Sequence, residues 1–171
     1  MGADITLKDW LEGCCSWIRD ELNINPDTQR DEFIRNVEDQ LLESNLCDSM
    51  VAGTGLPENA PAMNDERLHG QPVLVEITTI DEIGHSAFSL RNTRQTRIER
   101  ADFAGLALQE GVEDEEGPVP NYPHTMLKLQ LSDGNVTLPA IEYRAIPELK
   151  LGETPLGYKV CINNLLYRRS A

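Results

Sequence analysis

Apolar side chains recur at helical spacing over the first 47 residues of the chain. Over residues 6–22 they fall three and four positions apart, which is the stripe of an amphipathic helix with one buried face. Trp10 and Trp17 lie on this stripe, and we expect them to pack in the core rather than to line a ligand site. A second stripe continues to about residue 47. We therefore predict a small helical region over residues 1–48, which is too short to bury enough surface alone and packs on a second domain.

The apolar period changes to two in the second half of the chain. Residues 49–71 are rich in Gly, Pro and small polar side chains, and we interpret them as a linker. Beyond the linker, alternation predicts four strands, over residues 72–83, 126–131, 136–143 and 158–162. Asp133-Gly134 between the second and third strands is a strong hairpin signal. Short strands joined by tight turns fit a small Greek-key barrel, so we assign residues 72–171 to a β-domain and the chain to the α+β class.

A long segment, residues 88–122, separates the first two predicted strands. A connection of more than 30 residues inside a compact domain is functional or disordered, and we interpret this one as a long inserted loop. Four arginines stand three positions apart in it, and an apolar island follows them: Arg91, Arg94, Arg97 and Arg100, then Phe103, Leu106 and Leu108. The arginines could contact phosphate, pair with acids of a partner or be solvated. The island could become ordered on a partner or fold back over the barrel.

Charge and composition exclude several classes of function. The chain has 29 acidic and 15 basic residues, a net charge of −14, which disfavours tight independent binding to nucleic acid. Its apolar runs are far shorter than the roughly 20 residues that cross a membrane. The four cysteines and three histidines lack the spacing of a metal site, and no nucleophile–base signature or phosphate loop is present. We expect neither enzymatic activity nor a cofactor, metal or small-molecule substrate.

Two blocks of sequence resemble the N-terminal region of the RecQ-mediated genome instability protein 1 family. The first is Trp10-Leu11-x-x-Cys14-x-x-Trp17-Ile18. The second begins as Pro123-His124-Thr125-Met126-Leu127-Lys128-Leu129-Gln130-Leu131-Ser132-Asp133-Gly134 and continues through Ala140-Ile141-Glu142-Tyr143-x-x-Ile146-Pro147 to Pro155-x-Gly157-Tyr158-Lys159-Val160. Within these blocks we take Trp10, Trp17, Asp133, Gly134, Glu142, Pro147, Gly157 and Lys159 as structural positions of the motif.

The resemblance implies a helical appendage followed by an OB-fold, and a non-enzymatic scaffold in the nucleus. Its partner would be topoisomerase III, a type IA enzyme that works with a RecQ-family helicase to dissolve double Holliday junctions in homologous recombination, DNA repair and genome maintenance. In the family, the long connection between the first two barrel strands enters the topoisomerase gate, which maps here onto residues 88–122. The arginine series and the apolar island would then bind the partner, and contact with DNA would be indirect or weak.

The chain departs from the family pattern at its end. The family's barrel continues into a last strand of aliphatic residues, whereas this chain stops at Ala171, so we expect a barrel that lacks this strand and an exposed edge at residues 158–162.

The sequence also allows two alternative functions. One is an OB-fold module that binds single-stranded nucleic acid, and the other is the tudor-domain partner of topoisomerase III beta, which shares the helical-plus-OB arrangement.

Overall fold

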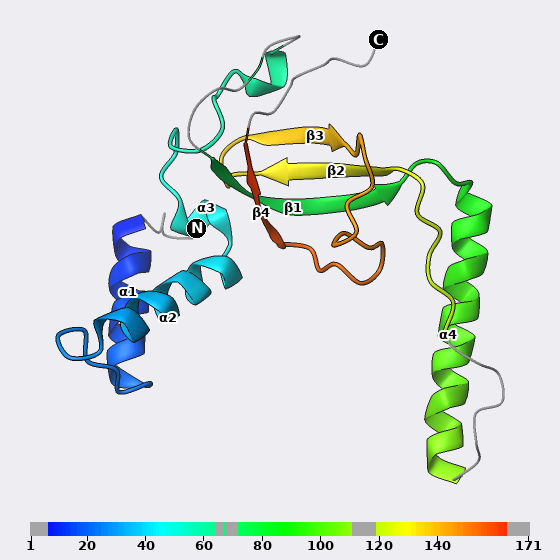
Figure 1. Cartoon of the computed structure of the whole chain (residues 1–171), viewed down its shortest axis with the longest axis horizontal. Coiled ribbons are helices and arrows are strands. Elements are labelled where there is room, and N and C mark those ends of the chain that lie inside the picture. The colour runs from blue at the N-terminus through cyan, green and yellow to red at the C-terminus, as the bar shows by residue number, and fades with distance from the viewer. Residues whose placement is uncertain (1–6, 64–66, 68–71, 111–118, 164–171) are drawn as a thin grey trace, which may run out of the picture. The chain divides into compact units, whose positions relative to one another are not determined.

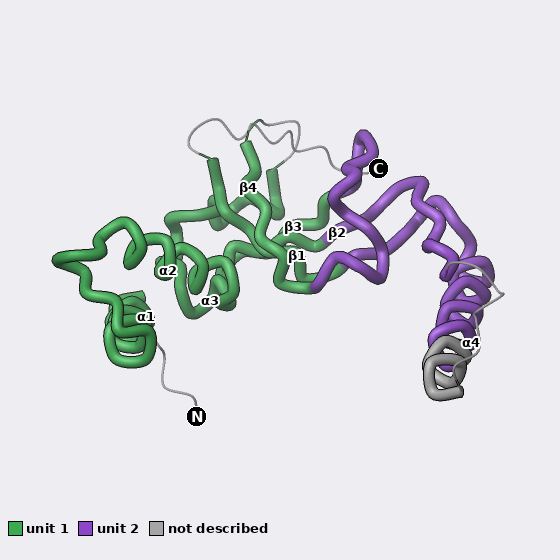
Figure 2. The backbone as a smooth tube through the Cα atoms, turned by 60° about the horizontal axis from the view of Figure 1, so that its bottom comes forward, with its two compact units in different colours: residues 1–79, 130–140, 156–171 green, residues 80–129, 141–155 purple. Residues whose placement is uncertain are grey.

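The computed structural model describes residues 7–63, 67, 72–110 and 119–163, and of residues 103–110 it describes the backbone alone. The chain forms two compact units (Figure 2). Unit 1 comprises residues 1–79, 130–140 and 156–171, and unit 2 comprises residues 80–129 and 141–155. We predict three consecutive regions, 1–48, 49–71 and 72–171. Each compact unit of the structure instead combines segments that are far apart in the sequence.

Unit 1 begins with the predicted helical region. α1 (Leu7–Asp20) packs against α2 (Arg30–Glu43) and α3 (Leu46–Ser49), around the fully buried Ile18 and Leu46. The second predicted helix is interrupted because Ser44 is extended and its N–H closes α2 on the carbonyl of Gln40. Trp10 is half-buried, but Trp17 is 43% exposed. The assignment of Trp17 to the core is therefore wrong: Trp10 and Trp17 share one face of α1, but this face is partly covered at Trp10 and open two turns later at Trp17.

The four predicted strands are present and form an antiparallel sheet in the order β3-β2-β1-β4 (Figure 1). They are β1 (Val73–Glu82), β2 (Leu127–Ser132), β3 (Thr137–Ile141) and β4 (Lys159–Ile162). β4 pairs with β1 in a register that places Ile162 opposite Val73 and Lys159 opposite Glu76. The α+β class is confirmed, and over the described residues the sheet is open. Residues 164–171, where we expect no regular last strand, lie outside the described residues.

The segment that we interpret as a linker is packed where the structure describes it. Leu56 and Ala60 are fully buried, and Ala60–Ala62 forms a 3-10 turn. The Asp133 carboxylate accepts a hydrogen bond of 2.6 Å from the Leu56 N–H. A side chain at Gly55 would overlap this carboxylate, so a glycine is required there. The Gly and Pro residues of this segment form turns and close main-chain contacts, and the segment is nevertheless packed.

The inserted segment is a helix, not the long loop that we predict for residues 88–122. α4 (Ala87–Glu110) is 24 residues long and follows β1 directly (Figure 1). Its sequence contains no proline. At the start of the helix, the Ser86 hydroxyl accepts a hydrogen bond from the Ser89 N–H. Farther along, the Gln95 side chain donates to the carboxylate of Glu99, which lies four positions on. The glycines and prolines that indicate a loop fall mostly after Glu110, at residues 111–118, which are outside the described residues.

No helix among the described residues, α4 included, combines the length and the apolar character needed to cross a membrane.

Candidate interaction site: the α4 insertion and its root

The four arginines of α4 do not share one surface. Residues three apart on an α-helix are offset by about 60° in one direction around its axis. The series therefore winds around roughly half of the helix, so that Arg91 and Arg94 are exposed while Arg97 and Arg100 are half-buried. The backbone of Phe103, Leu106 and Leu108 continues the same helix, but their side chains lie outside the description.

Arg97 is occupied within unit 2. Its guanidinium donates a hydrogen bond of 2.7 Å to the carbonyl of Pro120 and lies 5.0 Å from the centre of the Tyr122 ring. Such a cation–π contact stabilises by about 0.5–1 kcal/mol at exposed sites. Gly152 has a φ of +77°, and a Cβ there would lie 2.6 Å from the Tyr122 ring. The hydrogen bond and the ring contact of Arg97 hold the returning segment, which the structure describes from residue 119, beside the helix.

The solvent-facing side of α4 combines apolar and cationic side chains. Phe88 is 73% exposed, Ile98 is also exposed, and Arg91 and Arg94 lie between them along the helix. We call these four residues the α4 outer face. Large aromatic and aliphatic groups beside arginine are enriched in protein interfaces relative to the rest of a protein surface. The face is therefore suited to contact with another protein.

Glu82 accepts hydrogen bonds from both chain segments at the base of α4. Its Oε1 accepts a 2.6 Å hydrogen bond from the N–H of Gly84, which leads into α4. Its Oε2 accepts a 2.9 Å hydrogen bond from the N–H of Thr125 and a 3.2 Å bond from that of Met126, on the returning segment. Burial alone would raise the pKa of Glu82, but these main-chain donors and the nearby His85 together hold it below its ordinary value of 4.5.

Glu142 holds the next amide of the returning segment. It accepts hydrogen bonds from the N–H groups of Leu127, at 3.1 Å, and Ile146, at 2.5 Å, and its Oε2 lies 2.7 Å from Nε2 of His124. Burial raises the pKa of Glu142, but the bonds from His124, Ile146 and Leu127 outweigh burial and hold the pKa below 4.5.

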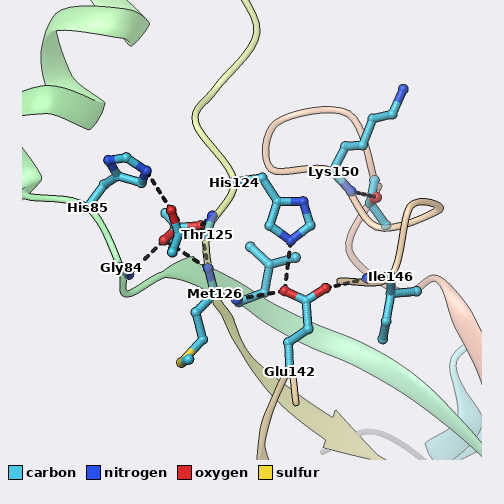
Figure 3. Close-up of polar contacts among 11 residues, drawn as sticks. Gly84, His85, His124, Thr125, Met126, Glu142, Ile146 and Lys150 are labelled. Carbon is cyan, nitrogen blue, oxygen red and sulfur yellow. Dashed lines mark hydrogen bonds and ion pairs between the residues drawn. The ribbon is translucent and has the colours of Figure 1, made fainter. Parts of the chain in front are cut away.

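Two buried carboxylates therefore hold three consecutive amides, those of residues 125–127 (Figure 3). Glu82 is 6% exposed and Glu142 is 7% exposed. The imidazole of His85 adds a 2.8 Å hydrogen bond with the Thr125 hydroxyl. We call Glu82, Glu142, His85 and His124 the root clamp.

The other structural positions of the motif stabilise unit 1 or lie in turns. Asp133 accepts N–H bonds from Leu56, Asn135 and Val136. Lys159 forms a buried ion pair of 3.1 Å with Glu76 and donates to the carbonyl of Gly157. Gly134, with a φ of +92°, leaves room for the main chain of α3, and Pro147 lies exposed in the turn after Glu142.

Sequence reasoning missed Glu76, Glu82 and His124 as members of these clusters. Glu76 is flanked by Val75 and Ile77 in a strand, and an acid in that setting is a signal for a buried partner. Glu82 and His124 carry no such signal, because their partners are main-chain amides or a carboxylate distant in the sequence.

The polar groups of the root are suited to holding structure. Each clamp carboxylate is occupied by several donors, which leaves it little capacity to accept a proton from a substrate. Over the described ranges, no group of three or more His, Cys, Asp or Glu residues is arranged to hold a metal ion.

Comparisons with known proteins match both parts of the chain. The family described as "RMI1, N-terminal helical domain" matches residues 5–49, and that described as "RMI1, N-terminal OB-fold domain" matches residues 54–171. The RecQ-mediated genome instability protein 1 of Mus musculus is 27% identical over 160 residues, which cover 94% of this chain and 24% of the mouse protein. That of Danio rerio is 26% identical over 146 residues, which cover 85% of this chain and 27% of the fish protein.

This chain thus spans about a quarter of the length of these relatives. Its helical region, its open antiparallel sheet and both family matches agree along most of the sequence. The chain belongs to the RMI1 family and comprises the family's N-terminal helical and OB-fold domains.

Proposed function

We propose that this chain is a non-enzymatic scaffold that binds a type IA topoisomerase, topoisomerase III, and that the α4 outer face is part of the contact. The observation that carries the proposal is the position of α4, which lies between the first two strands of the OB-fold domain. The family resemblance assigns the topoisomerase-contacting element to this position. The composition of the outer face, with Phe88, Ile98, Arg91 and Arg94 toward solvent, supports a protein partner.

The scaffold would act together with a RecQ-family helicase in the nucleus. The relatives are named RecQ-mediated genome instability proteins, and this name supports a role in genome maintenance. In this proposal α4 tunes the opening of the topoisomerase gate while double Holliday junctions are dissolved.

DNA would be reached through the topoisomerase and not by this chain alone. A net charge of −14 repels a phosphate backbone, so binding without the enzyme should be weak and strongly weakened by salt. Arg91 and Arg94 are exposed cations that could approach DNA once the enzyme has brought it near.

Binding of the cognate topoisomerase III at micromolar concentration tests the proposal. The variant R91E/R94E reverses the two exposed charges of the outer face, and R30E/R35E makes the same change in charge on exposed positions of α2. We expect R91E/R94E to weaken binding by roughly tenfold or more and R30E/R35E to leave it nearly unchanged. Absence of binding by the unaltered chain, or equal losses in the two variants, contradicts the proposal. A parallel titration with single-stranded DNA and no enzyme identifies an independent DNA-binding module.

A further inference from the structure

The direction of α4 depends on two short chain segments that meet at its base. One segment, residues 83–86, leads from β1 into the helix, and the other, residues 119–126, returns to β2. They are joined by the Ile83 N–H bond to the Met126 carbonyl and by the bonds of Glu82 to both sides. Beyond these, the bond and ring contact of Arg97 hold the returning segment farther along the helix.

Apolar packing contributes little at this base. The buried apolar residues described in unit 2 are Leu127, Leu129 and Leu149, and Ile83, Phe88 and Met126 beside the root are exposed. Hydrogen bonds accepted by Glu82 from both segments, and by Glu142 from Leu127 and His124 at the end of the returning one, therefore supply much of the constraint.

The two oxygens of Glu82 accept their shortest hydrogen bonds from different segments, so both oxygens must be acceptors. Oε1 accepts the short bond from Gly84 on the entering segment, Oε2 accepts that from Thr125 on the returning segment, and the Met126 N–H lies 3.3 Å and 3.2 Å from the two oxygens. A glutamine offers one accepting oxygen and would direct an NH₂ group at the donors of the other, so it loses the short bond from Gly84 or the short bond from Thr125. Glu142 divides its oxygens similarly, with Oε1 on Ile146 and Oε2 on Leu127 and His124.

We propose that Glu82 and Glu142 are positioning residues, which fix the direction in which α4 leaves the sheet and thereby the presentation of its outer face to the partner. The part of this inference that concerns the partner rests on the proposed function. Neither residue needs to touch the partner, since both side chains are buried. Their effect is transmitted through the main chain at Gly84 and at residues 125–127.

The test uses the full chain and a matched carboxylate in unit 1. Asp133 is also buried and also divides its oxygens, with Oδ1 on Asn135 and Val136 and Oδ2 on Leu56. E82Q and E142Q are compared with D133N, and hydrogen exchange is measured for peptides covering residues 83–102, 119–129 and 46–60. We expect E82Q and E142Q to accelerate exchange at the root and the first turns of α4 by roughly tenfold or more, with residues 46–60 unchanged. D133N should show the reverse pattern.

Binding to topoisomerase III is then measured at equal folded fractions. E82Q should weaken binding several-fold although the outer face is chemically intact, and D133N should not. Gly84→Ala provides a variant that retains the carboxylate, because its Cβ would lie 2.7 Å from the Thr125 side chain and 2.9 Å from Oε1 of Glu82. We expect it to accelerate exchange at the root and the first turns of α4, so that the inference can be tested even if E82Q does not fold.

Three results would overturn the inference: the same exchange pattern in E82Q and D133N, no change at the root in E142Q and G84A, or a root that loosens without any effect on binding. The exchange measurements need no topoisomerase. Failure of the unaltered chain to bind the enzyme would therefore count against the proposed function and not against the role of the clamp in directing α4.

Discussion

Each of the two units of this chain is stabilised internally by different interactions. Unit 1 contains ten of the buried apolar side chains that the structure describes, among them Ile18, Leu46, Leu56 and Ile77, whereas unit 2 contains three. Both units also contain buried carboxylates that accept main-chain hydrogen bonds. In unit 1 these groups accompany an extensive set of buried apolar side chains, whereas in the described part of unit 2 few buried apolar side chains surround them.

The difference shows how the same chemical group has different consequences in different surroundings. A carboxylate inside an extensive core is coupled to the packing around it, so its loss should lower the stability of the whole unit. A carboxylate that joins two segments with little packing around them should act locally.

Loss of the buried lysine in unit 1 should be the most damaging of these changes. Lys159→Met leaves Glu76 as a buried charge without its ion-pair partner, which typically costs about 3–5 kcal/mol. Chemical denaturation should detect this as a loss of global stability. The double variant E76Q/K159M retains an acceptor for the Leu46 N–H and should lose less than K159M alone. A double variant as unstable as the sum of the two single changes would show that the two charges are not coupled.

A methyl group at the hairpin should distinguish crowding from backbone strain. Gly134→Ala combines a positive φ with overlap onto the main chain of Leu46 and Cys47, and we expect a loss of about 2–5 kcal/mol. Gly157→Ala has a similar φ of +86° but no atom within 4 Å of the added Cβ, so its loss should be about 1–2 kcal/mol. Thermal denaturation of the two variants gives the comparison. Equal losses would mean that the close approach of α3 is not a constraint.

Removal of a clamp charge in unit 2 should have an intermediate and local effect. Glu142→Gln leaves at least one buried N–H poorly paired, at a cost of about 1–3 kcal/mol. Hydrogen exchange should show the change in residues 119–129 and not in the core of unit 1. A uniform loss of protection through both units would contradict the contrast between them.

Acid should loosen the root of α4 through the same groups. The folded pKa values of Glu82 and Glu142 lie below 4.5, so their stabilising effect is fully present above that pH and is lost as the pH falls below 4.5 through the folded values. Exchange at residues 119–129, corrected for the intrinsic effect of pH, should accelerate in this window. The double variant E82Q/E142Q should lack this dependence. An unchanged acid response in the double variant would assign it to other carboxylates.

The smallest effect is expected from the arginine that binds the returning segment. Arg97→Ala removes the contact with Tyr122 and the bond to Pro120, and we expect a loss of about 1 kcal/mol or less. The matched change Arg94→Ala, at an exposed position of the same helix, should alter stability by less than about 0.5 kcal/mol. Differential scanning calorimetry can rank the two. A larger loss in R94A would show that Arg94, and not Arg97, is the arginine that packs within unit 2.

The sheet and α1 could be predicted because burial leaves a periodic pattern in the sequence. Alternation identifies all four strands, and Asp133-Gly134 identifies the hairpin, since both patterns follow from which side chains face the core. α4 lacks that information. Much of its described surface faces solvent, so few positions are constrained to be apolar, and its helical character is carried by propensity and by local bonds such as that of Ser86.

The root clamp could not be predicted for a different reason. Its carboxylates accept bonds from main-chain amides, and every residue except proline carries such a donor. The partners of Glu82 at residues 125 and 126 are more than 40 positions away, and only the fold brings them together. Glu142 was identified through the family resemblance and not through its chemistry. The buried part of the predicted linker was missed in the same way, because Leu56 is one apolar residue among turns.

Because α4 is long, a small rotation at its base produces a large displacement at its far end. At about 1.5 Å per residue, its 24 residues extend roughly 36 Å, so a rotation of about 10° at the base would displace the far end by about 6 Å. That displacement is about twice the length of a hydrogen bond. Residues at the base can therefore determine which contacts are geometrically possible at the far end. In a mutational scan for partner binding, the buried Glu82 would then affect contacts at the far end of α4, whereas the exposed Arg91, in the second turn of the helix, could act only through contacts of its own.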